Sequence, residues 1–508
     1  MSKPESESGL HHRVAPMEMS AEEFRDLGHR LVDDIAAFLE TLANRPVNRD
    51  ESPTEVRALL PEGALPDEGT TAKDLLAEVT PLLFEHSLFN GHPRFLGYIT
   101  SSAAPLGALA DLLAATINPN LGGWQLSPVA TEIERQSVRW IAELLGYPSD
   151  AGGLMVSGGN MANFHCFLAA RRAKTSESVR ARGIEEGDGR LLIYASEETH
   201  TWLQKAADLF GHGTDCIRWI PIDADLRADV GVLRQQIDED RRRGDRPFLI
   251  VGTAGTVSTG AVDPLAEMAD VAQEHDLWFH VDGAYGAFAV ITPDAPAELV
   301  AMKRADSIAV DPHKWLYAPL EAGCVLVRDV KTLTDAFSYT PTYYRFTGEE
   351  EDPRINFYEL GLQNSRGFRA LKVWLGLRQV GRSGYVRMIA DDMEIARELY
   401  RRVGEEPELE AFTQELSITT FRYVPAGLEA GVEPVETYLN QLNEELLARL
   451  KASGEAFLSN AEIGGTFALR ACIVNFRTSL ADIEALPEVV IRHGQEVDRD
   501  LRPASLRA

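Results

Sequence analysis

The chain has 508 residues, 44% hydrophobic and 25% charged, a composition that excludes a disordered protein and predicts two or three domains. Its 50 basic and 78 acidic residues give a net charge of −28, which argues against a general nucleic-acid-binding protein and against docking on an anionic membrane surface. No uninterrupted apolar run approaches the ~18 residues of a membrane span, and the polar N-terminus does not resemble a signal peptide. We therefore expect a soluble, cytoplasmic protein.

The cysteines are scattered along the chain and show neither CxxC nor Cys/His metal spacing. We expect buried free thiols in a reducing compartment, and we predict no metal site. The residues concerned are Cys166, Cys216, Cys324 and Cys472.

Residues 1–90 are expected to form a helical N-terminal segment, of which 1–19 are disordered. A helix is predicted to begin after Ser20, in a Ser-x-x-Glu capping box. Apolar residues recur at helical spacing from Phe24 onwards, and a second helix is predicted over Ala72–Phe84. The segment has too few residues for a core of its own, so its apolar face needs a partner.

The middle of the chain, residues 91–384, alternates strand-like and helix-like segments. A helix is predicted between Ser127-Pro128 and Gly146, and another over Pro264–His275. Such alternation predicts an α/β domain with a mostly parallel sheet covered on both faces, whose ligands lie beyond the carboxyl ends of the strands. The predicted strands are Leu191–Ala195, Cys216–Ile222, Phe248–Gly252, Trp278–Val281, Ser307–Val310 and Cys324–Arg328.

The chain changes character from about Gly384. Long charged helices and strands of alternating pattern follow, so we expect residues 385–508 to form a smaller α+β domain. The helices are predicted over Tyr385–Val403 and Val435–Ser453, and the strands over Leu416–Val424 and Thr466–Arg477.

A glycine turn follows the apolar run Leu154–Val156. Here Ser157-Gly158-Gly159-Asn160 leads into a helical run that begins at Met161. Free backbone N–H groups and the positive end of a helix dipole suit a phosphate. An ordinary strand-to-helix turn has the same pattern, so this motif alone does not establish a phosphate site.

Asp282 follows the apolar run Trp278–Val281 and precedes several small residues. A carboxylate at the end of a buried strand must be paired or solvated. It could cap a helix, or it could hold a protonated ring nitrogen while the small residues let a flat ring approach the backbone.

Lys314 lies between His313 and Trp315, shortly after the strand Ser307–Val310. Desolvation lowers the pKa of a lysine and makes it a better amine nucleophile, able to form a Schiff base, although a lysine can also extend to solvent. Asp282 and Lys314 each come at the end of a predicted strand, and the two strands are one β-α-β unit apart. Both residues follow the possible phosphate turn in the sequence. Together they would provide a ring-nitrogen anchor, a Schiff-base lysine and a phosphate clamp, as pyridoxal 5′-phosphate requires.

Three separated motifs resemble the group II pyridoxal-phosphate-dependent amino-acid decarboxylases, which include the aromatic-L-amino-acid and glutamate decarboxylases. They are Gly91–Phe95, His280–Tyr285 and His313-Lys314-Trp315, and the resemblance runs roughly from residue 20 to 480. It implies the aspartate-aminotransferase-like fold (fold type I) and a homodimer with active sites at the subunit interface. The helical segment 1–90 would then serve dimerisation.

The resemblance also implies a role for each matching residue. Lys314 would carry the cofactor as a Schiff base, and Asp282 would pair with its ring nitrogen. Ala284 and His200 would lie on opposite faces of the ring, and Thr253 near its hydroxyl. The residues implied near the phosphate are Gly158, Gly159, Asn160, His313 and Asp311.

Two positions depart from the family pattern. Relatives with aromatic substrates often have Asn where this chain has Asp311, and an extra negative charge beside a phosphate is unfavourable unless it faces water or a donor. The phosphate turn is Gly-Gly-Asn rather than serine-rich, so backbone N–H groups must supply more of the binding.

The reaction implied is decarboxylation of an L-amino acid to its amine and CO₂. Tyr343 matches the family's loop tyrosine, contributed across the dimer, which protonates the product. Relatives that form aldehydes carry Phe at this position or Asn at the position of His200, and neither change is present. Retention of these residues with Lys314 and Asp282 also argues against a catalytically silent scaffold.

The substrate pocket implied by the resemblance is largely apolar and predicts an aromatic amino acid, including tryptophan. It would comprise Tyr98, Ile99, Gly122, Trp124 and His313. Decarboxylation of glutamate or 2,4-diaminobutyrate remains an alternative, as does an aldehyde synthase, a transaminase or another lyase on the same scaffold.

Overall fold

The structure is a computed structural model that describes residues 15–184, 189–339 and 354–506. These residues form two compact units, one taking the chain as far as Phe89 together with Ala452–Gly454, and the other taking the rest. The domain boundaries predicted at residues 90 and 384 stay predictions. Most of the leader predicted to be disordered lies outside the described residues.

The first unit contains the helices α2 (Ala21–Thr41), α3 (Pro53–Ala58) and α4 (Ala72–His86). The predicted start of α2 is confirmed, since Ser20 Oγ accepts a hydrogen bond from the backbone N–H of Glu23 at 3.1 Å. The rings of Phe38 and Phe84 stack 4.5 Å apart between α2 and α4. No residue of α2 is buried by the described chain, and Phe24 is 55% exposed. The predicted apolar face is therefore only partly covered by the described residues of a single chain.

A seven-stranded sheet forms the centre of the second unit, in the order β1-β7-β6-β5-β4-β2-β3. The predicted mostly parallel sheet is confirmed, because each neighbouring pair from β6 through β5, β4 and β2 to β3 is parallel. The strands are β1 (Gly152–Val156), β2 (Leu191–Ser196), β3 (Ile217–Ile220), β4 (Arg246–Thr253), β5 (Trp278–Asp282), β6 (Ser307–Val310) and β7 (Gly323–Val327).

Strand β7 runs antiparallel to both of its neighbours, β6 and β1. The connection from β6 to β7 contains only the short helix α12 (Pro312–Trp315). A parallel return needs a crossover that passes along the whole sheet, whereas an antiparallel return can be short. The segment that carries Lys314 thus lies in a short connection at the carboxyl end of β6.

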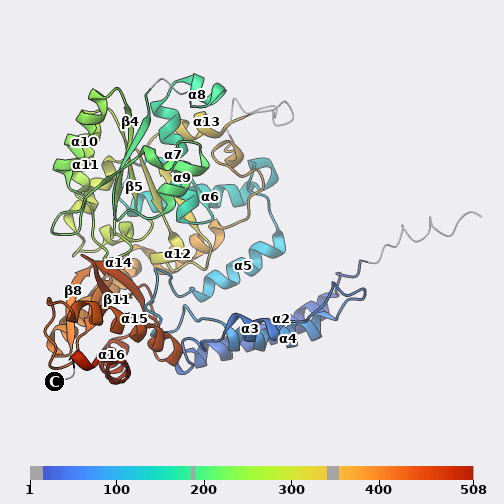
Figure 1. Ribbon diagram of the computed structural model, residues 1–508. Helices are drawn as coiled ribbons and strands as arrows, with labels where there is room; N and C mark the ends of the chain where they lie inside the picture. Colours follow the sequence, from blue (N-terminus) through green and yellow to red (C-terminus); the bar gives the residue numbers. More distant parts are fainter. Residues whose placement is uncertain (1–14, 185–188, 340–353, 507–508) are drawn as a thin grey trace, which may run out of the picture. The chain divides into compact units, whose positions relative to one another are not determined.

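Helices cover both faces of this sheet, as predicted. Figure 1 shows α10 and α11 on one side of β4 and β5, with α7 and α9 on the other. No helix among the described residues has the length and apolarity needed to cross a membrane. The helices up to this point of the second unit are α5 (Pro105–Ile117), α6 (Pro128–Leu144), α7 (Gly159–Lys174), α8 (Glu177–Arg182), α9 (Trp202–Leu209), α10 (Val230–Arg242), α11 (Leu265–Glu274) and α13 (Lys331–Phe337).

A four-stranded antiparallel sheet in the order β10-β11-β9-β8 follows towards the C-terminus. The long helix α14 is kinked at Gly381, where φ is +65°, a conformation that glycine adopts without strain. Apolar residues of this sheet and its helices form a second hydrophobic cluster. The elements are α14 (Ala370–Glu405), β8 (Leu409–Glu415), β9 (Ile418–Tyr423), α15 (Val435–Ser453), β10 (Ser459–Ile463), β11 (Thr466–Cys472) and α16 (Leu480–Leu501).

Several predicted boundaries need correction. The strand predicted from Leu416 begins at Ile418, because Leu416 has φ +50° and belongs to the turn. The helix predicted from Tyr385 corresponds to the part of α14 that follows the kink at Gly381, and a further helical part, from Ala370 to the kink, was not predicted.

Candidate active site

The polar side chains that follow the strands of the large sheet converge on one cavity of 350 Å³. Parallel strands bring their carboxyl ends to the same edge, which explains why residues distant in sequence meet here. Every residue predicted to hold the cofactor lines this cavity: Gly158, Gly159, Asn160, His200, Thr253, Asp282, Ala284, Asp311, His313 and Lys314. Their individual roles stay predictions.

The glycine turn after β1 forms one wall of the cavity. Gly158 has φ +136°, and helix α7 begins at Gly159. A Cβ atom on Gly159 would lie 2.8 Å from Asp311 Oδ2, so this approach requires glycine. The first N–H groups of an α-helix lack intrahelical acceptors, and α7 therefore presents donors suited to an anion.

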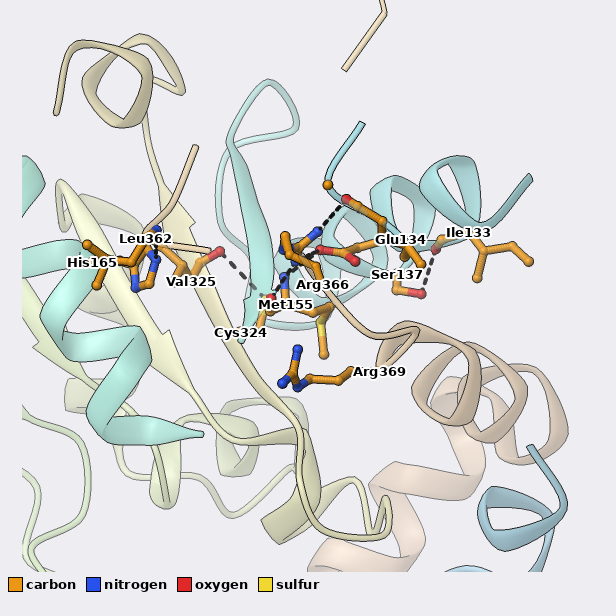
Figure 2. A network of polar contacts seen from close by, with 12 residues as sticks. Ile133, Glu134, Ser137, Met155, His165, Cys324, Val325, Leu362, Arg366 and Arg369 are labelled. Atoms are coloured by element: carbon orange, nitrogen blue, oxygen red, sulfur yellow. Dashed lines mark hydrogen bonds and ion pairs between the residues drawn. The ribbon is translucent and has the colours of Figure 1, made fainter. Parts of the chain in front are cut away.

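A buried ion pair between Glu134 of α6 and Arg366 anchors the strand that leads to this turn (Figure 2). Arg366 Nη2 donates to the carbonyl oxygen of Met155 at 2.6 Å, and the Met155 N–H donates to Glu134 Oε1 at 2.9 Å. Arg366 Nη1 also donates to the carbonyl oxygen of Leu121 at 3.1 Å. Sequence reasoning missed this pair. Glu134 interrupts the apolar face that α6 buries, and a carboxylate there must find a partner.

Asp282, at the end of β5, is 6% exposed and accepts hydrogen bonds from two neutral donors. Its Oδ2 accepts from Trp202 Nε1 at 2.7 Å, and its Oδ1 accepts from the Ala284 N–H at 3.1 Å. Hydrogen bonds to a carboxylate favour its charged form. Sequence reasoning missed Trp202, because a tryptophan among apolar residues is usually part of the hydrophobic core.

Behind Asp282 lies the buried imidazole of His280, also on β5. Its Nε2 contacts Asn163 Oδ1 at 2.7 Å and its Nδ1 contacts Ser307 Oγ at 2.9 Å. Burial lowers the pKa of His280 to about 4, so the ring is neutral at neutral pH. The ring also meets Trp202 edge-on at 5.7 Å. This packing fixes the tryptophan that bonds Asp282.

Lys314 lies in the turn after β6, with its Nζ 3.1 Å from Asp311 Oδ2. The turn is anchored from behind by Asp392 of α14, whose Oδ2 accepts from Trp315 Nε1 at 2.9 Å and from Tyr317 Oη at 2.7 Å. Burial raises the pKa of Asp392 to about 7. The lysine is thus held by a rigid, largely buried scaffold.

His200 reaches the cavity from the connection between β2 and α9. Its Nδ1 accepts a hydrogen bond from the Trp202 N–H at 3.2 Å, which leaves the proton of the neutral ring on Nε2. Burial lowers the pKa of His200, and the nearby Asp282 opposes this shift. A neutral, flat imidazole therefore faces the cavity.

The residues present fit pyridoxal phosphate. Thr253 Oγ1 is buried at the cavity and has no hydrogen-bond partner among the described residues. Such an atom is costly unless a ligand or water completes it. The glycine turn would hold the phosphate, Lys314 the aldehyde and Asp282 the ring nitrogen.

The predicted substrate residues other than His313 are not among the described residues that line this cavity. Tyr98 is exposed and has φ +52°, whereas Trp124 lines a separate cavity and donates to Glu132 Oε1 at 3.1 Å. A Cβ on Gly122 would lie 2.1 Å from a backbone oxygen, so local packing alone requires glycine there. Tyr343 lies outside the described residues.

Comparison with known proteins agrees with this geometry. The sequence model of the pyridoxal-dependent decarboxylase conserved domain matches residues 53–424. The chain belongs to this family.

Individual relatives resemble the chain over nearly its whole length. An aromatic-L-amino-acid decarboxylase of Bacillus atrophaeus is 34% identical and covers 92% of the chain and 94% of its own length. A phenylacetaldehyde synthase of Petunia hybrida is 29% identical, covering 94% of the chain and 95% of itself. The crystal structure of Oryza sativa TDC with PLP and tryptamine has a TM-score of 0.87 at 27% identity, covering 95% of the chain and 99% of its own. Fold type I, the pyridoxal phosphate cofactor and the decarboxylase class are thereby confirmed.

Proposed function

We propose that this chain converts an aromatic L-amino acid into the corresponding amine and CO₂. The observation that carries the proposal is the convergence of Lys314, Asp282 and the Gly158-Gly159 turn on one cavity. The aromatic class is supported by the Bacillus relative, which matches this chain almost from end to end.

Bound pyridoxal phosphate supplies an electron sink for the electron pair that remains on the substrate when CO₂ departs. The protein's part is to bind, orient and hold charge. Asp282, which accepts hydrogen bonds from Trp202 and the Ala284 N–H, would pair with the ring nitrogen and stabilise positive charge there. The neutral imidazole of His200 would pack on the ring, and Lys314 would hold the aldehyde carbon.

The working enzyme in this proposal is a homodimer in the cytoplasm. Apolar residues are exposed on α2 and, separately, on α5, where Leu109, Leu112 and Ile117 are each more than half exposed. Tyr98 and Trp124 do not line the cavity of their own chain, which a partner's cavity would explain. Tyr343 would reach the product from the partner subunit in the same way.

A substrate panel tests the proposal. The purified enzyme is incubated with tryptophan, tyrosine, phenylalanine, glutamate and 2,4-diaminobutyrate, and amine and CO₂ are both quantified. We expect equimolar amine and CO₂ from at least one aromatic substrate, with Lys314→Ala as the inactive control. Activity confined to glutamate or 2,4-diaminobutyrate would refute the aromatic class.

The same assay separates the aldehyde-forming alternative, which the Petunia relative keeps open. Hydrogen peroxide and aldehyde are measured beside the amine. With Tyr343 and His200 present, amine should account for the product. Aldehyde in place of amine would contradict simple decarboxylation.

A further inference from the structure

A carboxylate lies where the cofactor's phosphate is expected to bind. Asp311 is 2% exposed, and its Oδ2 lies against Gly159, the first residue of α7. Its Oδ1 is buried without a hydrogen-bond partner among the described residues. Without cofactor, the charge of Asp311 is balanced by Lys314 Nζ at 3.1 Å.

The neighbouring imidazole of His313 cannot donate a hydrogen bond to Asp311 when it is neutral. His313 Nδ1 lies 2.7 Å from the Ala322 carbonyl oxygen, a contact that requires the proton on Nδ1 and outweighs the longer approach of the Ala322 N–H at 3.2 Å. The bare Nε2 then faces Asp311 Oδ2 at 3.7 Å. Burial lowers the pKa of His313, although Asp311 opposes this shift.

The other groups near Asp311 do not supply a positive charge that could take the place of Lys314. His200 faces it from the connection after β2 and Cys324 from β7, and burial keeps both in their neutral forms, lowering the pKa of His200 and raising that of Cys324. The N-terminus of α7 favours negative charge, but the phosphate would use the same donors. When the Lys314 nitrogen bonds to the cofactor's aldehyde carbon, releasing water, it is no longer an ammonium that pairs with Asp311.

We infer that binding of the cofactor's phosphate takes up one proton, shared among Asp311, His313 and the phosphate oxygens, so that phosphate affinity falls as pH rises. A phosphate dianion beside a buried carboxylate would otherwise leave adjacent negative charges in a region of low dielectric. The proton belongs to the cluster rather than to one residue. The inference rests on the proposed placement of the phosphate at Gly158 and Gly159.

The test compares two ligands that differ only in the phosphate. The full chain, freed of cofactor, is titrated with pyridoxal 5′-phosphate and with pyridoxal between pH 6 and 9. Both ligands form the same bond to Lys314, but pyridoxal also closes on itself as a hemiacetal through its free 5′-hydroxyl, so the quantity compared is the change of the ratio of dissociation constants with pH, not the ratio itself. Because a phosphate monoester loses its second proton near pH ~6, the advantage of the phosphate should fall by about tenfold per pH unit above that value.

Asp311→Asn removes the carboxylate and should make the phosphate's advantage independent of pH above ~6. At pH 8 the variant should favour pyridoxal phosphate over pyridoxal at least about tenfold more than the natural chain does. The matched control is Asp391→Asn, which removes the same charge at an exposed position and should keep the natural pH dependence. Equal slopes in the natural chain and in Asp311→Asn would overturn the inference.

A second measurement needs no variant. Calorimetric titration of the natural chain with pyridoxal phosphate at pH 8, in buffers of different ionisation enthalpy, should count about one more proton taken up than titration with pyridoxal. Equal proton counts would refute the inference even if Asp311→Asn does not fold. Failure of the proposed function is separate, since cofactor that forms no bond to Lys314 would give no ligand-dependent absorbance change.

Discussion

Two buried carboxylates follow neighbouring strands of the same sheet and face the same cavity, yet their surroundings differ. Asp282, after β5, accepts hydrogen bonds from two neutral donors, Trp202 and the Ala284 N–H. Asp311, after β6, lies 3.1 Å from Lys314 Nζ, and its Oδ1 has no hydrogen-bond partner within the part of the chain that the structure describes. The hydrogen bonds to Asp282 therefore come from groups that the cofactor leaves in place, whereas Asp311 is paired with Lys314, the residue that the cofactor would bond.

The largest effect is expected from Asp282→Asn. The amide cannot carry the negative charge that the ring nitrogen needs, so turnover at saturating cofactor should fall by about 10³-fold. Asp311→Asn, measured the same way, should lose less, because its effect lies in cofactor affinity. A turnover of Asp282→Asn within tenfold of that of the natural enzyme would contradict the role given to Asp282.

Glu134 extends the comparison to a carboxylate with a permanent cationic partner. Glu134→Gln leaves Arg366 buried without its counter-ion and should lower the unfolding free energy by about 3–5 kcal/mol. The exposed Arg401, which pairs with Glu398 and Glu405, provides the control, and Arg401→Gln should leave the denaturant midpoint nearly unchanged because solvent screens exposed ion pairs. Denaturant midpoints measure both changes. Equal, small shifts would show that the ion pair behind the phosphate turn is not a stabilising anchor.

Trp202→Phe tests whether the indole N–H holds the Asp282 carboxylate in position at the cavity. The substitution keeps an aromatic ring and removes a hydrogen bond to a charged acceptor, worth about 1.5–3 kcal/mol. Cofactor affinity and turnover should each fall about tenfold or more. Trp374→Phe, which removes an N–H bonded to Gln136, should leave both unchanged. If the two variants behave alike, Trp202 does not support Asp282.

Asp392 gives an effect of another kind, seen in the pH dependence of stability. Its pKa is raised to about 7 by burial, so between its ordinary value and pH 7 the folded chain binds a proton that the unfolded chain does not. This contribution to stability is present at low pH and is lost as pH rises towards 7. The melting temperature of the natural chain should therefore drop more between pH 5 and 8 than that of Asp392→Asn. Identical drops would contradict a proton on Asp392.

Local sequence rules predicted much of the fold and the site. The helix Val435–Ser453 and the strand Ser307–Val310 have the predicted bounds, because caps and apolar periodicity are local signals. Asp282 and Lys314 could be placed in one site because parallel strands present their carboxyl ends together.

Long-range pairing could not be predicted in the same way. Nothing in the apolar run of β7 shows that it returns antiparallel. The bonds from Trp202 to Asp282 and from Arg366 to Glu134 join residues far apart in the chain, and they exist only after the sheet and helices have assembled. A single sequence also cannot tell which subunit's cavity Tyr98 and Trp124 serve.

The most direct test of the central claim is to identify the lysine that bonds the cofactor. The enzyme is incubated with pyridoxal phosphate, reduced with borohydride, digested and analysed by mass spectrometry. We predict one modified peptide, with the cofactor attached to Lys314. Lys372 is an internal control, because it is also largely buried but pairs with Asp111. Modification at Lys372 or another lysine, or no modification at all, would contradict the account.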